Sequence, residues 1–224
     1  MIRRIVALAL AAFCLAASGE TWAAPFLPPL FGAAKPQPSL VFDYQGWRVD
    51  ASGAAKAQRP AKTVKAIRAQ IDLVQRAGLP QAVLQVMRAV PVTAATGLSP
   101  DPNGYVRGRG VTLHVKDLDD KRPVLLRLLL YAYEDQGLPG GGANPDVARF
   151  RQAAAAEHVW PKTAAMLRSD ADYFAMTASA YLVGAITREP YTRANLRRTQ
   201  PDAYQWLARL FDGGRARVSA RALS

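Results

Sequence analysis

The sequence is poor in the side chains that most often bind transition metals. Its 224 residues include one cysteine, Cys14, and two histidines, His114 and His158. Protein zinc sites are built mostly from cysteine and histidine, with three or four protein ligands for each ion. His114 is expected on the polar face of a surface strand, and His158 near the end of a helix. These counts exclude a disulfide framework and an ordinary zinc site of cysteine and histidine ligands.

The first apolar run is too short to cross a membrane. It extends from Ile5 to Ala17, whereas a membrane-spanning helix needs about 20 residues. Arg3 and Arg4 precede it, and Thr21-Trp22-Ala23 places small residues where signal peptidase inspects the chain. We therefore predict a signal peptide over residues 1–23, cleaved after Ala23, and a secreted or periplasmic protein with no transmembrane span in its mature form.

Acidic residues are scarce relative to basic ones. The chain has 29 lysines and arginines against 17 aspartates and glutamates, a formal net charge of +12. Such a surface attracts anionic partners such as lipid headgroups, lipopolysaccharide or nucleic acid. The basic residues are scattered and show no aromatic-interleaved stripe of the kind that binds single strands. A solvated, arginine-rich surface is therefore an equally simple explanation, and a protein partner stays open.

The remaining sequence predicts one α+β domain, expected to be monomeric, over residues 40–212. A Pro-rich lead-in, residues 24–39, precedes it, and a basic tail, residues 213–224, follows it. Alternating apolar residues predict strands in a small mixed sheet over residues 40–49, 82–92 and 111–116. The first strand changes phase at Gln45-Gly46, which indicates a turn or bulge. Apolar residues three and four apart predict a helix over residues 61–78 on one face of this sheet.

Two further helices are expected to form the centre of the domain. Residues 123–136 are apolar on almost every side, as in a buried helix. Residues 169–184 carry many alanines, which allow another backbone to approach closely, and Ser169 with Asp172 has the spacing of a capping box. Contact is expected along Leu129, Ala132, Ala175 and Ala178. Shorter C-terminal helices are predicted over the ranges 147–158, 162–167, 192–198 and 201–211.

Four segments carry a family resemblance. The chain reads LLRLLLYAYEDQ from Leu125, LPGG from Leu138, SDADYFA from Ser169 and PDAYQWL from Pro201. Together they resemble the gluzincin-type zinc peptidases of the anthrax-lethal-factor-like group, which have an LLHELLHAYxDQ helix, LPGG, an SDxEYFA segment and a closing PxxYxWL helix. The resemblance implies a zincin-like fold, in which the HExxH helix binds zinc and its glutamate activates the bound water.

The residues that would carry this chemistry are replaced. The resemblance places Arg127 and Tyr131 at the two histidine positions, Leu128 at the glutamate, and Asp172 at the third zinc ligand. We therefore expect no cofactor, and zinc only if the chain is an atypical metallopeptidase. Glu134, Asp135 and Asp172 are the carboxylates that could instead bind a hard cation.

Two alternatives stay open at these positions. Asp172 serves either as a capping residue or as the remnant of the metal site. Arg127 either pairs with Asp172, replacing the metal with a fixed positive charge, or extends to solvent. The resulting hypothesis is a metallopeptidase-like protein without catalysis and with a binding or structural role, a pseudoenzyme. The alternatives are a hydrolase with an atypical site in the same cleft and a basic anion-binding protein of the cell envelope.

The signal peptide gives the first testable prediction. Because signal peptidase cleaves after a small residue, mature protein recovered from the host should begin at Ala24. N-terminal sequencing of the recovered protein measures this directly. A membrane-bound form that keeps Met1 would contradict the predicted export.

Overall fold

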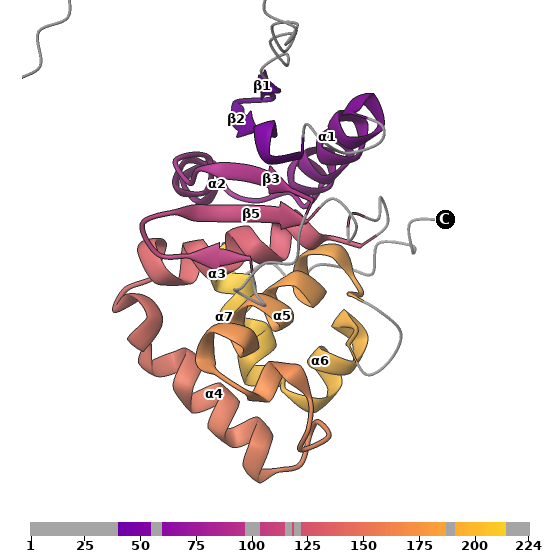
Figure 1. Cartoon of the computed structure of the whole chain (residues 1–224). Helices are drawn as coiled ribbons and strands as arrows, with labels where there is room; N and C mark the ends of the chain where they lie inside the picture. Colours follow the sequence, from indigo (N-terminus) through magenta and orange to yellow (C-terminus); the bar gives the residue numbers. More distant parts are fainter. Residues whose placement is uncertain are drawn as a thin grey trace, which may run out of the picture. The chain divides into compact units, whose positions relative to one another are not determined.

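The structure is a computed structural model that describes residues 40–54, 60–96, 104–114, 118, 122–186 and 191–213 (Figure 1). Residues Gln37–Ser224 form one compact unit. The predicted signal peptide, the Pro-rich lead-in and the tail from residue 214 onward lie outside the described residues, as do positions 115 and 116 of the third predicted strand. None of the described helices is both long and apolar enough to cross a bilayer.

A mixed sheet forms one half of this unit. Its five strands are β1 (Val41–Tyr44), β2 (Trp47–Asp50), β3 (Val92–Ala95), β4 (Tyr105–Val106) and β5 (Gly110–His114). The order across the sheet is β1-β2-β3-β5-β4. The central strands β2, β3 and β5 run parallel, with Val92 opposite both Val49 and Val111. The edge strands β1 and β4 run antiparallel to their neighbours, and the predicted small mixed sheet is confirmed.

The first two strands form the hairpin that the phase change at Gln45-Gly46 predicts. Both turn residues have positive φ, 48° at Gln45 and 82° at Gly46. A two-residue turn of this kind matches the twist of antiparallel strands, and glycine adopts it without a steric penalty. The Arg88 side chain packs against this turn. A β-carbon on Gly46 would lie 3.1 Å from the Nε atom of Arg88, so the turn leaves little room for a larger residue.

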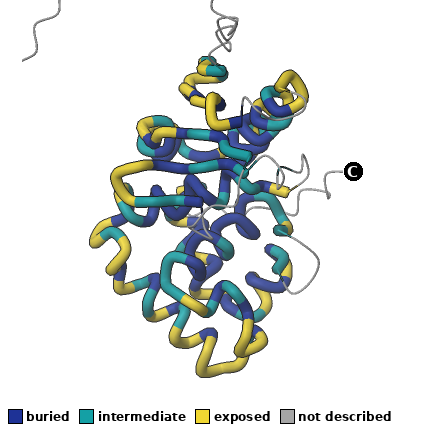
Figure 2. The backbone as a smooth tube through the Cα atoms, in the orientation of Figure 1, coloured by how far each residue is buried: buried dark blue, intermediate teal, exposed yellow. Residues whose placement is uncertain are grey.

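The sheet buries one face and leaves the other partly open. Trp47, Val49, Val92, Val111 and Leu113 are each at most 2% exposed. They share a hydrophobic core with residues of α1 (Pro60–Arg76), α2 (Gln81–Arg88) and α3 (Val124–Gly137). Figure 2 shows this burial along the strands and the central helices. The predicted helix over residues 61–78 is confirmed as α1, which ends two residues before Gly78.

The predicted strand over residues 82–92 is wrong. Residues Gln81–Arg88 form helix α2, and the strand β3 begins only at Val92, after Pro91. Val83, Leu84 and Met87 are buried at the spacing of a helix face, and α2 packs against α3. The valines favoured a strand, but β-propensity is weak and yields to the packing of an apolar helix face. The short strand β4 lies outside all three strands that the sequence predicts.

The central helix pair is confirmed. Helix α3 packs against α5 (Asp170–Val183), and Leu129, Ala132, Ala175 and Ala178 are all fully buried. The other α-helices are α4 (Pro145–Ala156), α6 (Arg193–Thr199) and α7 (Pro201–Asp212). The helix predicted over residues 162–167 is wrong in its extent, because only the 3-10 turn η4 (Ala165–Leu167) forms there. Figure 1 shows these C-terminal helices gathered around α5, below the sheet. Together with the sheet, they confirm the α+β class with a buried helix pair and C-terminal helices.

Side chains distant in sequence fix both ends of the central pair. Gln70 of α1 donates through Nε2 to the carbonyl of Arg122 at 2.9 Å and accepts from the amide of Leu125 at 3.1 Å. It therefore binds backbone groups at the start of α3, which has no cap from its own chain segment. At the C-terminal end of α5, the buried Arg193 donates to the carbonyls of Tyr181 and Leu182, at 2.5 and 3.0 Å. These bonds satisfy carbonyl groups in the last turn of this helix.

Candidate functional site

The site that the sequence singles out lies where α3 and α5 face each other. Arg127 and Tyr131 are one turn apart on α3, and Glu134 follows on the next turn. On α5, the N-cap Ser169 sets the first turn so that Asp172 faces α3. The Tyr131 hydroxyl donates to Oδ1 of Asp172 at 2.6 Å, and both residues are 5% exposed. The structure therefore brings together two of the four positions that the resemblance identifies.

Asp172 makes contacts on both of its oxygens. Its Oδ2 atom accepts from the Ser169 hydroxyl at 2.9 Å, and its backbone amide donates to Ser169 Oγ at 3.0 Å. The Ser169 hydroxyl thus satisfies one backbone donor at the start of α5, as an N-cap does, and the Asp172 carboxylate orients that hydroxyl by accepting its proton. Ser169 is therefore the cap of α5, and Asp172 holds the Ser169 hydroxyl in place while it also accepts the hydrogen bond from Tyr131.

The expected ion pair between Arg127 and Asp172 is not formed. The cation nearest to Asp172 is Arg168, whose Nε atom lies 3.6 Å from Oδ2. Among the described residues, Arg127 has no ion-pair partner, and its Nε atom is buried without a hydrogen bond. Arg168 lies before the N-cap Ser169 and therefore outside α5, so its contact with Asp172 depends on the turn that enters the helix. Helical spacing in the sequence does not reveal this partner.

Tyr131 is held in its protonated form. Burial raises the pKa of its hydroxyl, and the hydrogen bond and negative charge of Asp172 raise it further. The positive charges of Arg127 and Arg168 oppose this shift without reversing it. Because the phenol keeps its proton at neutral pH, Tyr131 acts as a hydrogen-bond donor to Asp172 and not as an anionic ligand.

Glu134 is the other unusual group of this region. Its side chain is 1% exposed, and burial raises its carboxyl pKa from 4.5 to about 7, with further contributions from Asp170 and Asp172. Its Oε1 atom accepts no hydrogen bond from the described residues. A carboxyl group in such surroundings is protonated in a large fraction of molecules near neutral pH.

Asp135 lies outside this group because it binds the edge of the sheet. Its Oδ2 atom accepts from the Tyr105 hydroxyl at 2.6 Å and from Arg107 Nε at 2.8 Å. These bonds attach the short strand β4 and the turn after it to the end of α3. The three carboxylates that could bind a hard cation, Glu134, Asp135 and Asp172, are therefore not brought to one point. The described ranges contain no cluster of three acidic, histidine or cysteine residues suited to a metal.

Leu128 belongs to the packed interior. It is 4% exposed, and its Cδ1 atom would lie 3.2 Å from a β-carbon on Gly104. Gly104 has a positive φ of 67°, so glycine is favoured there for its backbone as well as for this close approach. The position that the resemblance gives to a general base therefore holds an aliphatic side chain packed near the backbone at Gly104.

Zinc, which the resemblance implies, does not fit this set of side chains. A guanidinium has five donors and no acceptor, and leucine has neither. The Tyr131 oxygen carries a proton that it donates to Asp172. Asp172 is thus the single metal-binding group at the four positions. We therefore assign no chemical step to a metal at this site.

Comparisons with known proteins give a single line of similarity to report. No protein-family model matches the chain, and none of the curated proteins matches it. A solved structure to which it is similar is the Pro-Pro endopeptidase PPEP-2 from Paenibacillus alvei. The identity is 17% and the TM-score 0.48, over 70% of this chain and 94% of that one.

The Tyr131–Asp172 bond predicts a measurable loss of stability. Replacing Tyr131 with phenylalanine removes the donor and leaves Oδ1 of the buried Asp172 without it. We expect Tyr131→Phe to lower the free energy of unfolding by about 1–3 kcal/mol, measured by urea denaturation. Tyr133→Phe is the matched control, because the Tyr133 hydroxyl makes no hydrogen bond to the described residues. Equal losses in the two variants would contradict a special role for the Tyr131 bond.

Glu134 predicts a pH dependence of defined sign. Because its pKa is raised in the folded state, the native protein binds more protons than the unfolded chain, and stability is lost as pH rises from about 4.5 through about 7. Glu134→Gln cannot ionise and should escape this loss. Relative to wild type, the variant should gain on the order of 3 kcal/mol between pH 4 and pH 8.

Thermal and urea unfolding at several pH values measure this difference. Glu157→Gln is the control, since Glu157 is exposed at the end of α4 and its replacement should shift stability little at any pH. Parallel stability curves for wild type and Glu134→Gln would show that Glu134 is not the titrating group.

Proposed function

We propose that this chain is a metallopeptidase-like protein with a zincin-like scaffold that acts by binding, without zinc-dependent hydrolysis. The observation that carries the proposal is the bond from the Tyr131 hydroxyl to Asp172 at 2.6 Å. Asp172 is the one acidic side chain among the four positions that could bind a metal. In this bond its Oδ1 atom accepts from a neutral hydroxyl of the facing helix instead. The scaffold is kept, and its former ligand positions now hold α3 and α5 together.

The chemistry of the neighbouring positions supports the same proposal. Peptide hydrolysis by a zincin requires a Lewis acid that lowers the pKa of its water and a base that accepts the proton. Arg127 stays protonated at working pH and offers no lone pair to a metal. Leu128 is buried and cannot accept a proton. Neither requirement is met by the side chains at these positions.

One observation favours the alternative, a hydrolase with an atypical site. Glu134 has a pKa of about 7, which suits a general acid or base at neutral pH. Its side chain is 1% exposed, however, and a general base must lie within hydrogen-bond reach of the group it deprotonates. The burial of Glu134 therefore places binding ahead of hydrolysis as the proposed activity.

The proposed location is outside the cytoplasm, on the strength of residues 1–23. A net charge of +12 suits anionic components of a cell envelope. Arg48, Lys62, Lys65 and Arg76 are exposed on β2 and α1 and would contribute to such contacts. We also propose that the protein is a monomer, and that its partner is either such an anionic component or another protein.

The test is to rebuild the metal site. The variant carries Arg127→His, Leu128→Glu, Tyr131→His and Asp172→Glu together. Wild type should hold no stoichiometric zinc after dialysis, and the quadruple variant should bind close to one zinc per chain if the scaffold is zincin-like. Elemental analysis by mass spectrometry measures both. We expect no chelator-sensitive peptidase activity in wild type. Any such activity should be confined to the quadruple variant.

The control is the pair of changes Arg127→His and Tyr131→His without the changes at Leu128 and Asp172, which should bind zinc more weakly because the shorter Asp172 side chain is left in place of a glutamate. Folding of each variant is checked by circular dichroism before zinc is measured. Stoichiometric zinc in wild type, or equal zinc in wild type and a folded quadruple variant, would overturn the proposed function.

A further inference from the structure

Arg127 is a half-buried cation whose charge is not matched within the described part of the chain. Its Nε atom is shielded from solvent and makes no hydrogen bond, and no ion pair joins its guanidinium to a described carboxylate. Buried polar atoms are nearly always hydrogen-bonded, and an exception calls for a physical reason such as an absent ligand. Leaving a guanidinium unpaired is costly, because it keeps its charge at any working pH.

Three of the four acidic side chains on α3 and α5 already have other partners. Asp172 is held by Tyr131, Ser169 and Arg168. Asp170 pairs with Arg151, and Asp135 pairs with Arg107. Rearranging the side chains to pair Arg127 would therefore break a bond that another group needs.

Glu134 is the remaining acid of this region, and it is a poor counter-charge. Its carboxyl is buried and protonated in many molecules near neutral pH. The region around Tyr131 thus contains two guanidinium groups, Arg127 and Arg168, both close enough to act on the Tyr131 hydroxyl. Against them stands Asp172, whose two oxygens also accept from neutral hydroxyls. The local balance is an excess of positive charge at the helix interface.

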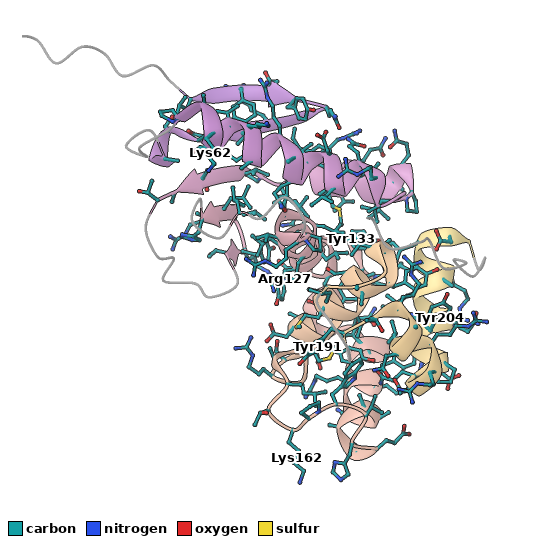
Figure 3. All side chains as sticks on the ribbon, turned by 90° about the vertical axis from the view of Figure 1, so that its right-hand side faces the viewer. Lys62, Arg127, Tyr133, Lys162, Tyr191 and Tyr204 are labelled. Atoms are coloured by element: carbon teal, nitrogen blue, oxygen red, sulfur yellow. The ribbon has the colours of Figure 1, made fainter. Side chains whose placement is uncertain are left out.

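The position of Arg127 leaves this charge within reach of a ligand. The residue is intermediate in exposure, and the Arg168 side chain is 61% exposed. Figure 3 shows Arg127 at the junction between the half that carries the sheet and α1 and the half formed by the C-terminal helices. A ligand would therefore approach the guanidinium from the side of Arg127 that solvent reaches.

We propose that Arg127, with Arg168 beside it, binds the terminal carboxylate of a peptide. A guanidinium presents parallel N–H donors that match the two oxygens of a carboxylate, and such charge-assisted pairs are among the stronger hydrogen bonds in proteins. A carboxylate carries one negative charge, so it is less costly to desolvate at a half-buried position than a doubly charged phosphate. The choice of a peptide rests on the proposed function, because a peptidase-like scaffold presents this junction to peptides.

The experiment compares two probes that differ at one group. The purified protein is titrated with N-acetyl-trialanine bearing a free carboxylate and with the same peptide as its carboxamide, in the presence of a chelator. The Arg127 Nε–H resonance is followed by nitrogen-15 NMR. The acid should cause a saturable shift and bind at least about tenfold more tightly than the amide, the difference expected of a hydrogen bond to a charged group.

Variants assign the effect to Arg127. Arg127→Gln should lose the preference for the acid, and Arg127→Lys should weaken it, because an ammonium keeps the charge but lacks the paired donors. Arg149→Gln is the control, since Arg149 is exposed on α4 and already paired with Asp146 at 2.8 Å, and it should bind as wild type does. The comparison of acid and amide in wild type needs no variant and stays informative if Arg127→Gln fails to fold.

Three results would overturn the proposal: equal binding of acid and amide, an acid preference that survives in folded Arg127→Gln, or tighter binding of inorganic phosphate than of the acid peptide. These results are separable from a failure of the proposed function. Zinc in wild type would refute the non-metal scaffold while leaving the acid preference measurable. Conversely, loss of the acid preference would leave the zinc measurements unchanged.

Discussion

The hydrogen bond between Tyr131 and Asp172 connects the two helices on which the rest of the domain is assembled. At 2.6 Å between buried groups, it joins the middle of α3 to the first turn of α5. A carboxylate buried in an apolar interface is costly unless its oxygens are satisfied. Tyr131, Ser169 and Arg168 satisfy them here, so the carboxylate that orients the cap of α5 also joins this helix to α3. Burial then keeps the phenol protonated, which preserves its role as donor.

The charges of the same interface are the basis of the proposed function. Asp172 engages neutral hydroxyls as well as a cation, Glu134 is partly neutralised by burial, and Arg127 keeps its full charge. A site arranged in this way can attract an anion, whereas it cannot activate water as a metal ion does. Leu128, at the position that the resemblance gives to the general base, is a buried aliphatic side chain that cannot accept a proton. Binding is therefore the activity that we propose for these side chains, and it requires no change in the packing of α3 against α5.

Much of the fold could be predicted because its signals are local. The turn at Gln45-Gly46, the caps at Ser169, Asn144 and Thr192, and the apolar faces of α1 and α3 all depend on residues within a few positions of each other. The segment from Gln81 to Arg88 was misjudged because valines at positions 83 and 86 suit a strand or a helix. Packing against α3 selects the helix, and that contact lies some forty residues further along the chain.

The sequence by itself determined the composition of the site: an arginine and a tyrosine one turn apart on a buried helix, a leucine between them, and an aspartate at the start of a second helix. It also determined the cap of that second helix, since Ser169 lies three residues before the aspartate and accepts from its backbone amide. Only the tertiary structure decided which partners meet. It placed the Tyr131 hydroxyl, 41 positions away in sequence, on Asp172, gave the ion pair to Arg168 and left Arg127 unmatched, and raised the pKa of Glu134. These outcomes depend on distance, burial and competition among charges, and those quantities exist only once the helices are packed.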